Sequence, residues 1–263
     1  MAADLIAAGT LASFLAGQAT TLGALPVFFL KGISQRTQNA FLGFAAGIML
    51  AASFFSLIIP GLEAAGDLHD GNKTIAALII AAAVLLGAAT LHFLNRIAPH
   101  EHFISGPMSG AERSKLSRIW LFVIAISLHN FPEGLAVGVS FGSPDKADGY
   151  ATALGIGLQN VPEGLAVALS LAAVGYSRAF SFFVALLTGL VEPVGGFLGI
   201  GAISLSSELL PWGLGFAGGA MIWVVSSEII PETHRDPKEG TATATFALMV
   251  GLAVMMSLDW IFG

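Results

Sequence analysis

Cysteine is absent from the 263-residue sequence, and charged residues are scarce. Without cysteine the chain has no disulfide, no thiolate metal site and no redox chemistry at sulfur, so a bound metal must be held by oxygen or imidazole. Asp, Glu, Lys and Arg make up 11% of the residues, against about 25% in soluble globular domains. No basic cluster is dense enough to bind nucleic acid. The composition therefore excludes a nucleic-acid partner and an ordinary soluble domain.

Apolar residues are abundant instead, at 55% of the chain with a mean hydropathy of +0.81. A helix that crosses a bilayer needs about 20 such residues, whereas barrel strands are shorter and alternate. The sequence predicts an all-α membrane protein in which one domain, 1–263, holds eight transmembrane helices. The expected spans are 5–30, 39–61, 75–94, 119–141, 150–173, 179–204, 209–230 and 243–262.

The basic residues predict the orientation of these spans. Of the 11 Lys and Arg, only Lys73 and Lys146 fall on one side, and the others lie on the side that includes the loop 95–118. By the positive-inside rule the richer side is cytoplasmic, which puts both termini outside the cytoplasm. The first residues lack the basic region of a signal peptide, so the first apolar run is expected to stay as a span.

A short polar motif occurs twice, near the middle of spans 4 and 5. It reads HNFPEG at 129–134 and QNVPEG at 159–164. On a helix, residues three and four apart share a face, so each copy projects its glutamate together with an amide or imidazole side chain. The prolines, Pro132 and Pro162, each remove a backbone hydrogen-bond donor. They predict non-helical backbone at membrane depth, which is tolerated only inside the protein or along a polar cavity.

A second internal similarity involves spans 2 and 7. The segments 56–60 and 227–231 read SLIIP and SEIIP, and after a one-residue slip 46–49 resembles 218–221. Because these spans run in opposite directions, the similarity predicts an inverted repeat in which spans 1–3 and 6–8 flank the central pair, spans 4 and 5. Such repeats are typical of transporters, with the binding site near the bilayer midplane.

Three glutamates, Glu133, Glu163 and Glu192, fall near the centres of their spans. A charged side chain at that depth costs about 2.5–3.5 kcal/mol, and no Lys or Arg lies at the same depth. Either the acids are protonated and bonded to one another as packing devices, or they bind one or two divalent cations. His129 favours the second reading, because imidazole with carboxylate suits zinc and iron. Glu192 precedes Pro193, which predicts that it sits at a helix interruption.

The doubled motif resembles that of the ZIP family of divalent-metal transporters. The segments 21–26 and 227–232, TLGALP and SEIIPE, are similar to its GufA-like bacterial branch. The resemblance implies transport of zinc, or of iron, manganese or cadmium, into the cytoplasm across a bacterial plasma (inner) membrane. It also implies that spans 1, 4, 5 and 6 slide as a block against the others.

The resemblance further implies a binuclear metal site between spans 4, 5 and 6, with the two motif glutamates bridging the ions. The first ion would be held by His129, Glu133, Gln159 and Glu163. The second ion would be held by Asn130, Glu133, Asn160, Glu163 and Glu192. Neutral amides at Gln159 and Asn160, where some relatives carry His or Asp, are expected to weaken the hold on a cation.

Two glutamates near the inner end of span 7, Glu228 and Glu232, are candidates to receive the metal on exit, although Ser227 stands where relatives often carry histidine. The alternative function is an intramembrane metal-dependent enzyme. Against it, the sequence has no His-Glu-x-x-His pair and too few imidazoles for a three-ligand zinc site with an open position. The glycine-rich helix faces would permit a homodimer.

Overall fold

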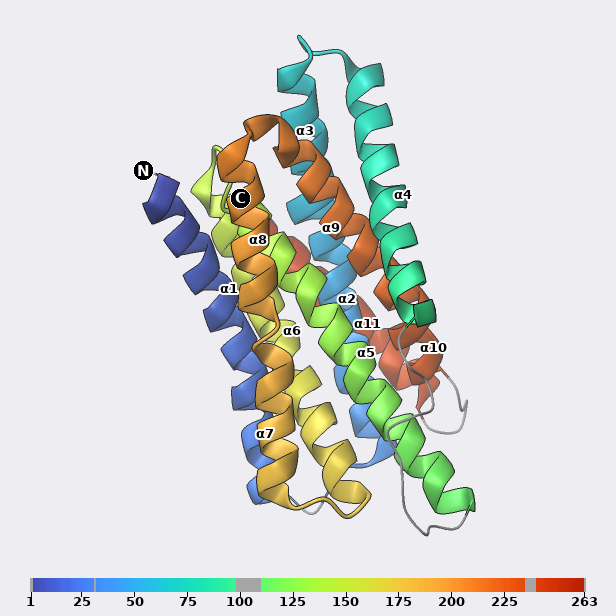
Figure 1. The fold of residues 1–263 in the computed structure, drawn as a ribbon. Coiled ribbons are helices and arrows are strands. Elements are labelled where there is room, and N and C mark those ends of the chain that lie inside the picture. The colour runs from blue at the N-terminus through green and yellow to red at the C-terminus, as the bar shows by residue number, and fades with distance from the viewer. Residues whose placement is uncertain (1, 31, 98–109, 235–239, 263) are drawn as a thin grey trace.

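The computed structural model describes every residue except 1, 31, 98–109, 235–239 and 263. All regular elements of this described part are helical (Figure 1). Before the first motif copy they are α1 (Ala2–Ala24), η1 (Leu25–Phe28), α2 (Gln35–Ala52), η2 (Ser53–Ile58), α3 (Ile59–Leu68) and α4 (Lys73–Ile97). The two motif helices are α5 (Gly110–Ser140) and α6 (Lys146–Ala173). After them come α7 (Arg178–Gly189), α8 (Glu192–Leu205), η3 (Ser207–Leu209), α9 (Leu210–Val224), η4 (Val225–Ile229), α10 (Ile230–Thr233) and α11 (Thr241–Phe262).

Within the described residues, seven helical stretches are long and apolar enough to cross a membrane. They correspond to the expected spans 1, 2, 3, 5, 6, 7 and 8, with ends shifted by a few residues. The remaining expected span lies in α5, a helix of 31 residues that carries the first motif copy. The chain is therefore a multi-pass, all-helical membrane protein.

One boundary differs clearly from the prediction. The loop was expected to extend from 95 to 118, but α4 continues to Ile97 and α5 already begins at Gly110. The segment 111–118 reads AERSKLSR, which is polar but rich in good helix formers. Hydropathy marks where a span leaves the apolar layer and not where its helix begins. The middle of the predicted loop, 98–109, lies outside the described residues.

The prolines of the two motif copies do not interrupt their helices, contrary to the prediction. Both Pro132 and Pro162 lie inside continuous helices, α5 and α6. The predicted break before Glu192 is present, because α7 ends at Gly189 and α8 begins at Glu192. Two further irregularities were not predicted: π-helical segments, η2 and η4, lie within spans 2 and 7, just before the Pro of each Ile-Ile-Pro segment.

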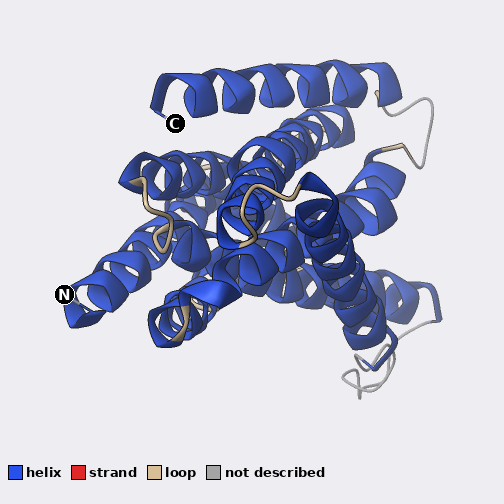
Figure 2. Cartoon of the chain, turned by 90° about the horizontal axis from the view of Figure 1, so that it is seen from above, coloured by secondary structure: helices blue, strands red, loops and turns tan. Residues whose placement is uncertain are grey.

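The helices pack in matched pairs. Helix α1 packs along α6 and α5 along α8, while α2 packs along α11 and α4 along α9. Figure 2 shows the bundle from one end, with α11 lying across its outer edge. In Figure 1 the N-terminus and the α3–α4 turn lie at the upper end and the α6–α7 turn at the lower end.

Glycines allow the closest of these contacts. A Cβ at Gly134 would clash with the carbonyl oxygen of Glu192, and one at Gly195 with that of Phe131. In the other pair, a Cβ at Gly164 would clash with the carbonyl oxygen of Thr20. Small residues let transmembrane helices approach in this way. Since these glycines serve contacts within one chain, they are no argument for the homodimer that the sequence permitted.

Candidate metal centre

The two motif copies meet in the interior of the bundle. Helix α5 supplies Glu133 and α6 supplies Glu163, and the break between α7 and α8 places Glu192 beside them. All three side chains are fully buried, with 0% of each residue exposed. Glu163 and Glu192 lie close enough to Glu133 to interact with it electrostatically. The packing of α5 on α8 thus brings the three predicted acids into one cluster.

The two motif asparagines use their amide nitrogens to hold this arrangement. Asn130 Nδ2 donates to the carbonyl oxygen of Thr188 at 2.8 Å, just before the α7–α8 break. Asn160 Nδ2 donates to the carbonyl oxygen of Ala16 at 2.9 Å and to Glu192 Oε1 at 2.7 Å. Because the nitrogens are occupied by protein acceptors, the amide oxygens of both residues are left to face other groups.

Those oxygens, and most of the carboxylate oxygens, have no partner. Buried polar atoms are normally hydrogen-bonded, because an unmet buried acceptor costs about 1–3 kcal/mol. In the described part of the chain, the unpartnered oxygens of the predicted site are Asn130 Oδ1, Gln159 Oε1, Asn160 Oδ1, both carboxylate oxygens of Glu133 and of Glu163, and Glu192 Oε2. The amide nitrogen of Gln159 and Nδ1 of His129 are unpartnered as well, so the buried oxygen acceptors far outnumber the donors among them. An excess of acceptors suits a cation.

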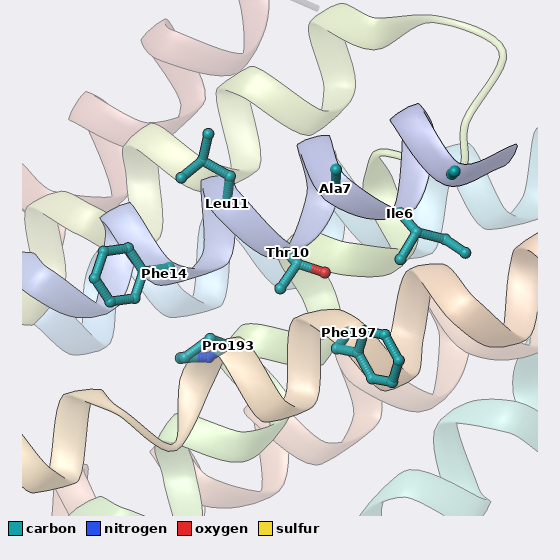
Figure 3. Close-up of a pocket in the computed structure, with 8 residues that line it drawn as sticks. Ile6, Ala7, Thr10, Leu11, Phe14, Pro193 and Phe197 are labelled. Atoms are coloured by element: carbon teal, nitrogen blue, oxygen red, sulfur yellow. The ribbon is translucent and has the colours of Figure 1, made fainter. Parts of the chain in front are cut away.

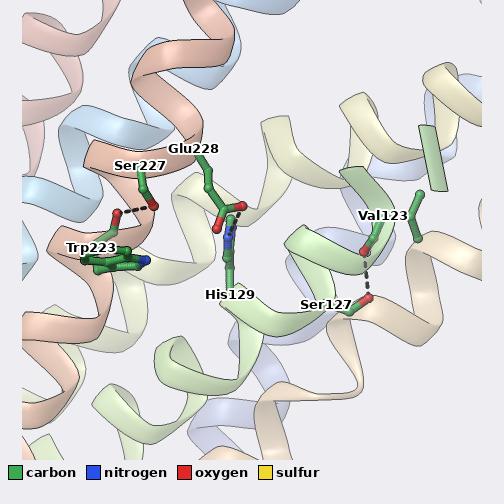
Figure 4. A network of polar contacts seen from close by, with 6 residues as sticks. All are labelled: Val123, Ser127, His129, Trp223, Ser227 and Glu228. Atoms are coloured by element: carbon green, nitrogen blue, oxygen red, sulfur yellow. Dashed lines mark hydrogen bonds and ion pairs between the residues drawn. The ribbon is translucent and has the colours of Figure 1, made fainter. Parts of the chain in front are cut away.

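One ring nitrogen of His129 contacts a glutamate outside the cluster of three acids. Its Nε2 lies 3.0 Å from Oε2 of Glu228, the residue expected on the exit path, and Figure 4 shows the ring pointing from α5 toward η4. The other ring nitrogen, Nδ1, has no hydrogen-bond partner. His129 is 2% exposed whereas the side chain of Glu228 is 23% exposed. The contact therefore links the buried cluster to a partly open position in span 7.

The predicted metal ligands lie near one another, but their side chains do not converge on one point. Among the described residues, no three His, Asp or Glu side chains lie in a geometry that could hold an ion together. Gln159 lies close to the carboxylate of Glu133. The other exit candidate, Glu232, is exposed in α10, and the Ser227 hydroxyl donates to the Trp223 carbonyl oxygen of its own helix at 2.8 Å. The binuclear ligand set thus stays a prediction.

Sequence reasoning missed the residues that support the cluster from outside the motif. Ser13 of α1 is fully buried, and its Oγ donates to the carbonyl oxygen of Glu192 at 2.8 Å. The carbonyls of Ala16 and Thr188 receive the asparagine amides. Main-chain acceptors leave no signature in a sequence, but a lone serine in an apolar span could have marked α1 as part of the site.

An apolar groove on α1 and α8 is separate from this cluster. Its volume is about 640 Å³, and its lining includes Leu11, Phe14 and Phe197 (Figure 3). None of the predicted metal ligands lines it. We therefore place the candidate site at the buried acids and not in the groove.

A multi-pass helical bundle with buried acids between its central helices is the class of protein that carries cations across membranes. Comparison with known sequences agrees. The model of the ZIP zinc transporter family matches residues 107–259. The chain is 50% identical over 257 residues to the zinc transporter GufA of Myxococcus xanthus, covering 97% of this chain and 99% of that protein.

Two further relatives are similar along nearly the whole chain. The zinc transporter ZIPB of Bordetella bronchiseptica is 50% identical over 245 residues, covering 93% of this chain and 78% of its own. The human zinc transporter ZIP11 is 32% identical over 329 aligned positions, covering 95% of each chain. The protein belongs to the ZIP zinc transporter family. Since that family consists of transporters, the alternative of an intramembrane metal-dependent enzyme is set aside.

Proposed function

We propose that the protein carries zinc into the cytoplasm through a binuclear site between α5, α6 and α8, in the inner membrane of a bacterium with both termini outside. Iron, manganese and cadmium, which prefer related ligands, are further candidate substrates. The observation that carries the proposal is the buried set of unpartnered oxygens centred on Glu133, Glu163 and Glu192. A divalent ion among them would satisfy the acceptors and neutralise the negative charge at once.

The competing explanation is that these acids are protonated packing devices. It requires the acids to hydrogen-bond to one another. Both oxygens of Glu133 and both of Glu163 are instead without a partner. Buried polar groups used for packing are normally satisfied, so the arrangement favours a site that awaits a ligand.

The ligands proposed for the first ion are His129, Glu133, Gln159 and Glu163, and those for the second are Asn130, Glu133, Asn160, Glu163 and Glu192. In this proposal the His129 ring alternates between the cluster and Glu228. The contact between His129 and Glu228 supports a step in which the ion passes toward the inner end of span 7. Glu232, exposed beyond it, is the proposed last contact before release. An ion must bind weakly enough to leave, and neutral amides among the ligands serve that end.

Matched contacts support the inverted repeat. Gly134 meets the Glu192 carbonyl as Gly164 meets that of Thr20. Asn130 donates to the Thr188 carbonyl as Asn160 donates to that of Ala16. In each comparison the first contact joins spans 4 and 6, and the second joins spans 5 and 1.

The π-helical segments also support the repeat, because spans 2 and 7 each contain one at a corresponding place. The segment in span 2, η2, has six residues and the one in span 7, η4, has five. Each lies between the methionine and the Ile-Ile-Pro segment that the two spans share, where the register of the similarity changes by one. A π-bulge is the usual way for a helix to absorb one extra residue. The difference of one residue between the two segments matches the slip and supports the proposed repeat.

The helix pairing also supports the sliding block. Helices α1, α5, α6 and α8 pack closely with one another, whereas α2 pairs with α11 and α4 with α9. The proposed block thus contains every ligand of the binuclear site, and Glu228 belongs to the opposing helices. The ion would travel with the block and meet Glu228 at the end of the movement.

Transport by purified protein in liposomes tests the proposal. Zinc uptake is followed with a dye trapped inside the vesicles, comparing the wild type with Glu163→Ala. The account predicts that uptake disappears in Glu163→Ala. A matched control, Glu208→Ala, removes a glutamate from the turn η3, outside the cluster, and should transport normally. Normal uptake by Glu163→Ala would refute the site.

A further inference from the structure

Thr20 of α1 carries a buried hydroxyl that no described residue satisfies. The residue is 0% exposed, and its Oγ1 has no hydrogen-bond partner. Buried serines and threonines in helices usually donate to the carbonyl one turn back. Ser53 does so to Met49, and Figure 4 shows the same bond from Ser127 to Val123, at 2.7 and 2.8 Å. Thr20 makes neither this bond nor a bond to another helix of the kind that Ser13 makes to the Glu192 carbonyl.

The hydroxyl lies next to a bond of the site. The carbonyl one turn before Thr20 belongs to Ala16, and it accepts the amide of Asn160 at 2.9 Å. The motif asparagine thus shares the acceptor that the hydroxyl would ordinarily use. An unmet buried hydroxyl costs free energy, so a hydroxyl next to the bonds of the site is a candidate ligand.

Thr20 also occupies the position that corresponds to Glu192. Gly164 packs on the Thr20 carbonyl as Gly134 packs on that of Glu192. The side chains match as well: a Cβ at Gly189 would lie 3.1 Å from Thr20 Cβ, and one at Gly17 would lie 3.3 Å from Glu192 Cβ. The two side chains therefore lie on opposite sides of the contact between α1 and the α7–α8 break, in equivalent surroundings.

Because the two side chains differ in length, only one of them reaches a motif asparagine. Glu192 reaches the amide of Asn160, with Oε1 at 2.7 Å from Nδ2. The corresponding asparagine, Asn130, bonds through its nitrogen to the Thr188 carbonyl, and its oxygen has no partner. Thr20 is two atoms shorter than a glutamate, so no equivalent bond joins it to Asn130. By the correspondence of the two halves, the unpartnered Thr20 Oγ1 would lie at the same end of the cluster as the unpartnered Asn130 Oδ1.

We infer that Thr20 is a further cation-contacting residue, whose hydroxyl supplies a neutral oxygen ligand to a divalent ion at the end of the site opposite Glu192. The inference rests on the proposed function and on the repeat. A hydroxyl adds no charge, so it holds the ion more weakly than the Glu192 carboxylate does. The site is accordingly strong at one end and weak at the other, and oxygen-preferring ions such as manganese depend on Thr20 more than zinc does.

Binding measurements on three variants test this. Thr20→Val keeps the shape and removes the hydroxyl, Thr20→Ser keeps the hydroxyl, and Thr10→Val removes an unpartnered hydroxyl that lines the groove of Figure 3 instead. Affinity is measured by competition with a fluorescent chelator, using zinc and manganese separately. Loss of one polar contact worth about 1 kcal/mol corresponds to about a fivefold weaker affinity. We expect that loss for manganese in Thr20→Val, a smaller loss for zinc, and wild-type affinity in the other two variants.

Thermal unfolding separates ligation from packing. Removing an unpartnered hydroxyl should leave the melting temperature of metal-free protein unchanged or higher, while the rise on adding manganese becomes smaller. Thr20→Val that binds like the wild type, or Thr20→Ser that loses as much affinity, would overturn the inference. Should Thr20→Val fold poorly, Thr20→Ala gives the same comparison. Glu163→Ala in the same assay distinguishes a failure of this inference from a failure of the proposed function. If Glu163→Ala also binds metal normally, the proposed site itself is wrong.

Discussion

The two halves of the candidate metal centre share a scaffold and differ in chemistry. One half joins α5 to α8 and carries His129 and Glu192, and the other joins α6 to α1 and carries Gln159 and Thr20 in the corresponding places. The glycine contacts and the asparagine bonds to a main-chain carbonyl are matched in the two halves, but only Asn160 also bonds to an acid, Glu192. The comparison teaches that backbone packing sets where the candidate ligands lie, while in our proposal a few side chains decide how strongly each end holds an ion.

The largest expected effect concerns the shared scaffold. Gly134→Ala and Gly164→Ala each push a methyl group into a carbonyl oxygen of the neighbouring helix. Overpacking of this kind costs about 1–3 kcal/mol, so both variants should lose similar stability in thermal unfolding of the detergent-solubilised protein. Gly201→Ala of α8 is the control, since nothing lies within 4 Å of its added Cβ. A large loss in only one of the two halves would break the comparison.

The next effect concerns the imidazole that only one half possesses. His129→Gln makes the first motif copy read like the second. Since zinc favours imidazole more than manganese does, zinc affinity should fall by about tenfold and manganese affinity by less. Competition curves for the two ions measure the difference. Equal losses for both would show that His129 does not bind the ion directly, and that its contact with Glu228 is structural.

The smallest effect concerns a support that exists in one half only. Ser13 Oγ donates to the Glu192 carbonyl, and the corresponding residue in the other half is Ala185. Ser13→Ala should cost about 0.5–1.5 kcal/mol of stability and weaken zinc binding slightly, because Glu192 loses a positioning bond. The unfolding midpoint and the zinc affinity are compared with those of Ser204→Ala, which removes a hydroxyl bonded only within α8. If Ser13→Ala loses no more stability and no more zinc affinity than that control, Ser13 does not position Glu192.

Much of this architecture follows from the sequence. Long apolar runs fix the spans, because the bilayer demands them, and Pro193 with the glycines after it marks the break at Glu192. The doubled motif placed the acids on α5 and α6. The break predicted at Pro132 and Pro162 is absent, because a transmembrane helix can continue through a proline when neighbouring groups satisfy the freed backbone carbonyls. The π-helical segments were not predicted, because the only feature of the sequence connected with them is the one-residue slip between spans 2 and 7.

The rest depends on contacts between residues far apart in the chain. The approach of His129 to Glu228 joins positions 99 residues apart, and it depends on how α5 and η4 meet and on one choice of rotamer. The acceptors at Ala16 and Thr188 are main-chain groups, for which any residue type would serve. Helix boundaries such as the start of α5 reflect propensity outside the bilayer, which hydropathy does not record.

The account stands on the claim that Glu133, Glu163 and Glu192 are buried together in order to hold a divalent ion. Diffraction from a zinc-soaked crystal, recorded on both sides of the zinc absorption edge, measures this most directly. We expect anomalous density among these carboxylates, between α5, α6 and α8. Density confined to surface residues, with the three acids hydrogen-bonded to one another, would contradict the account.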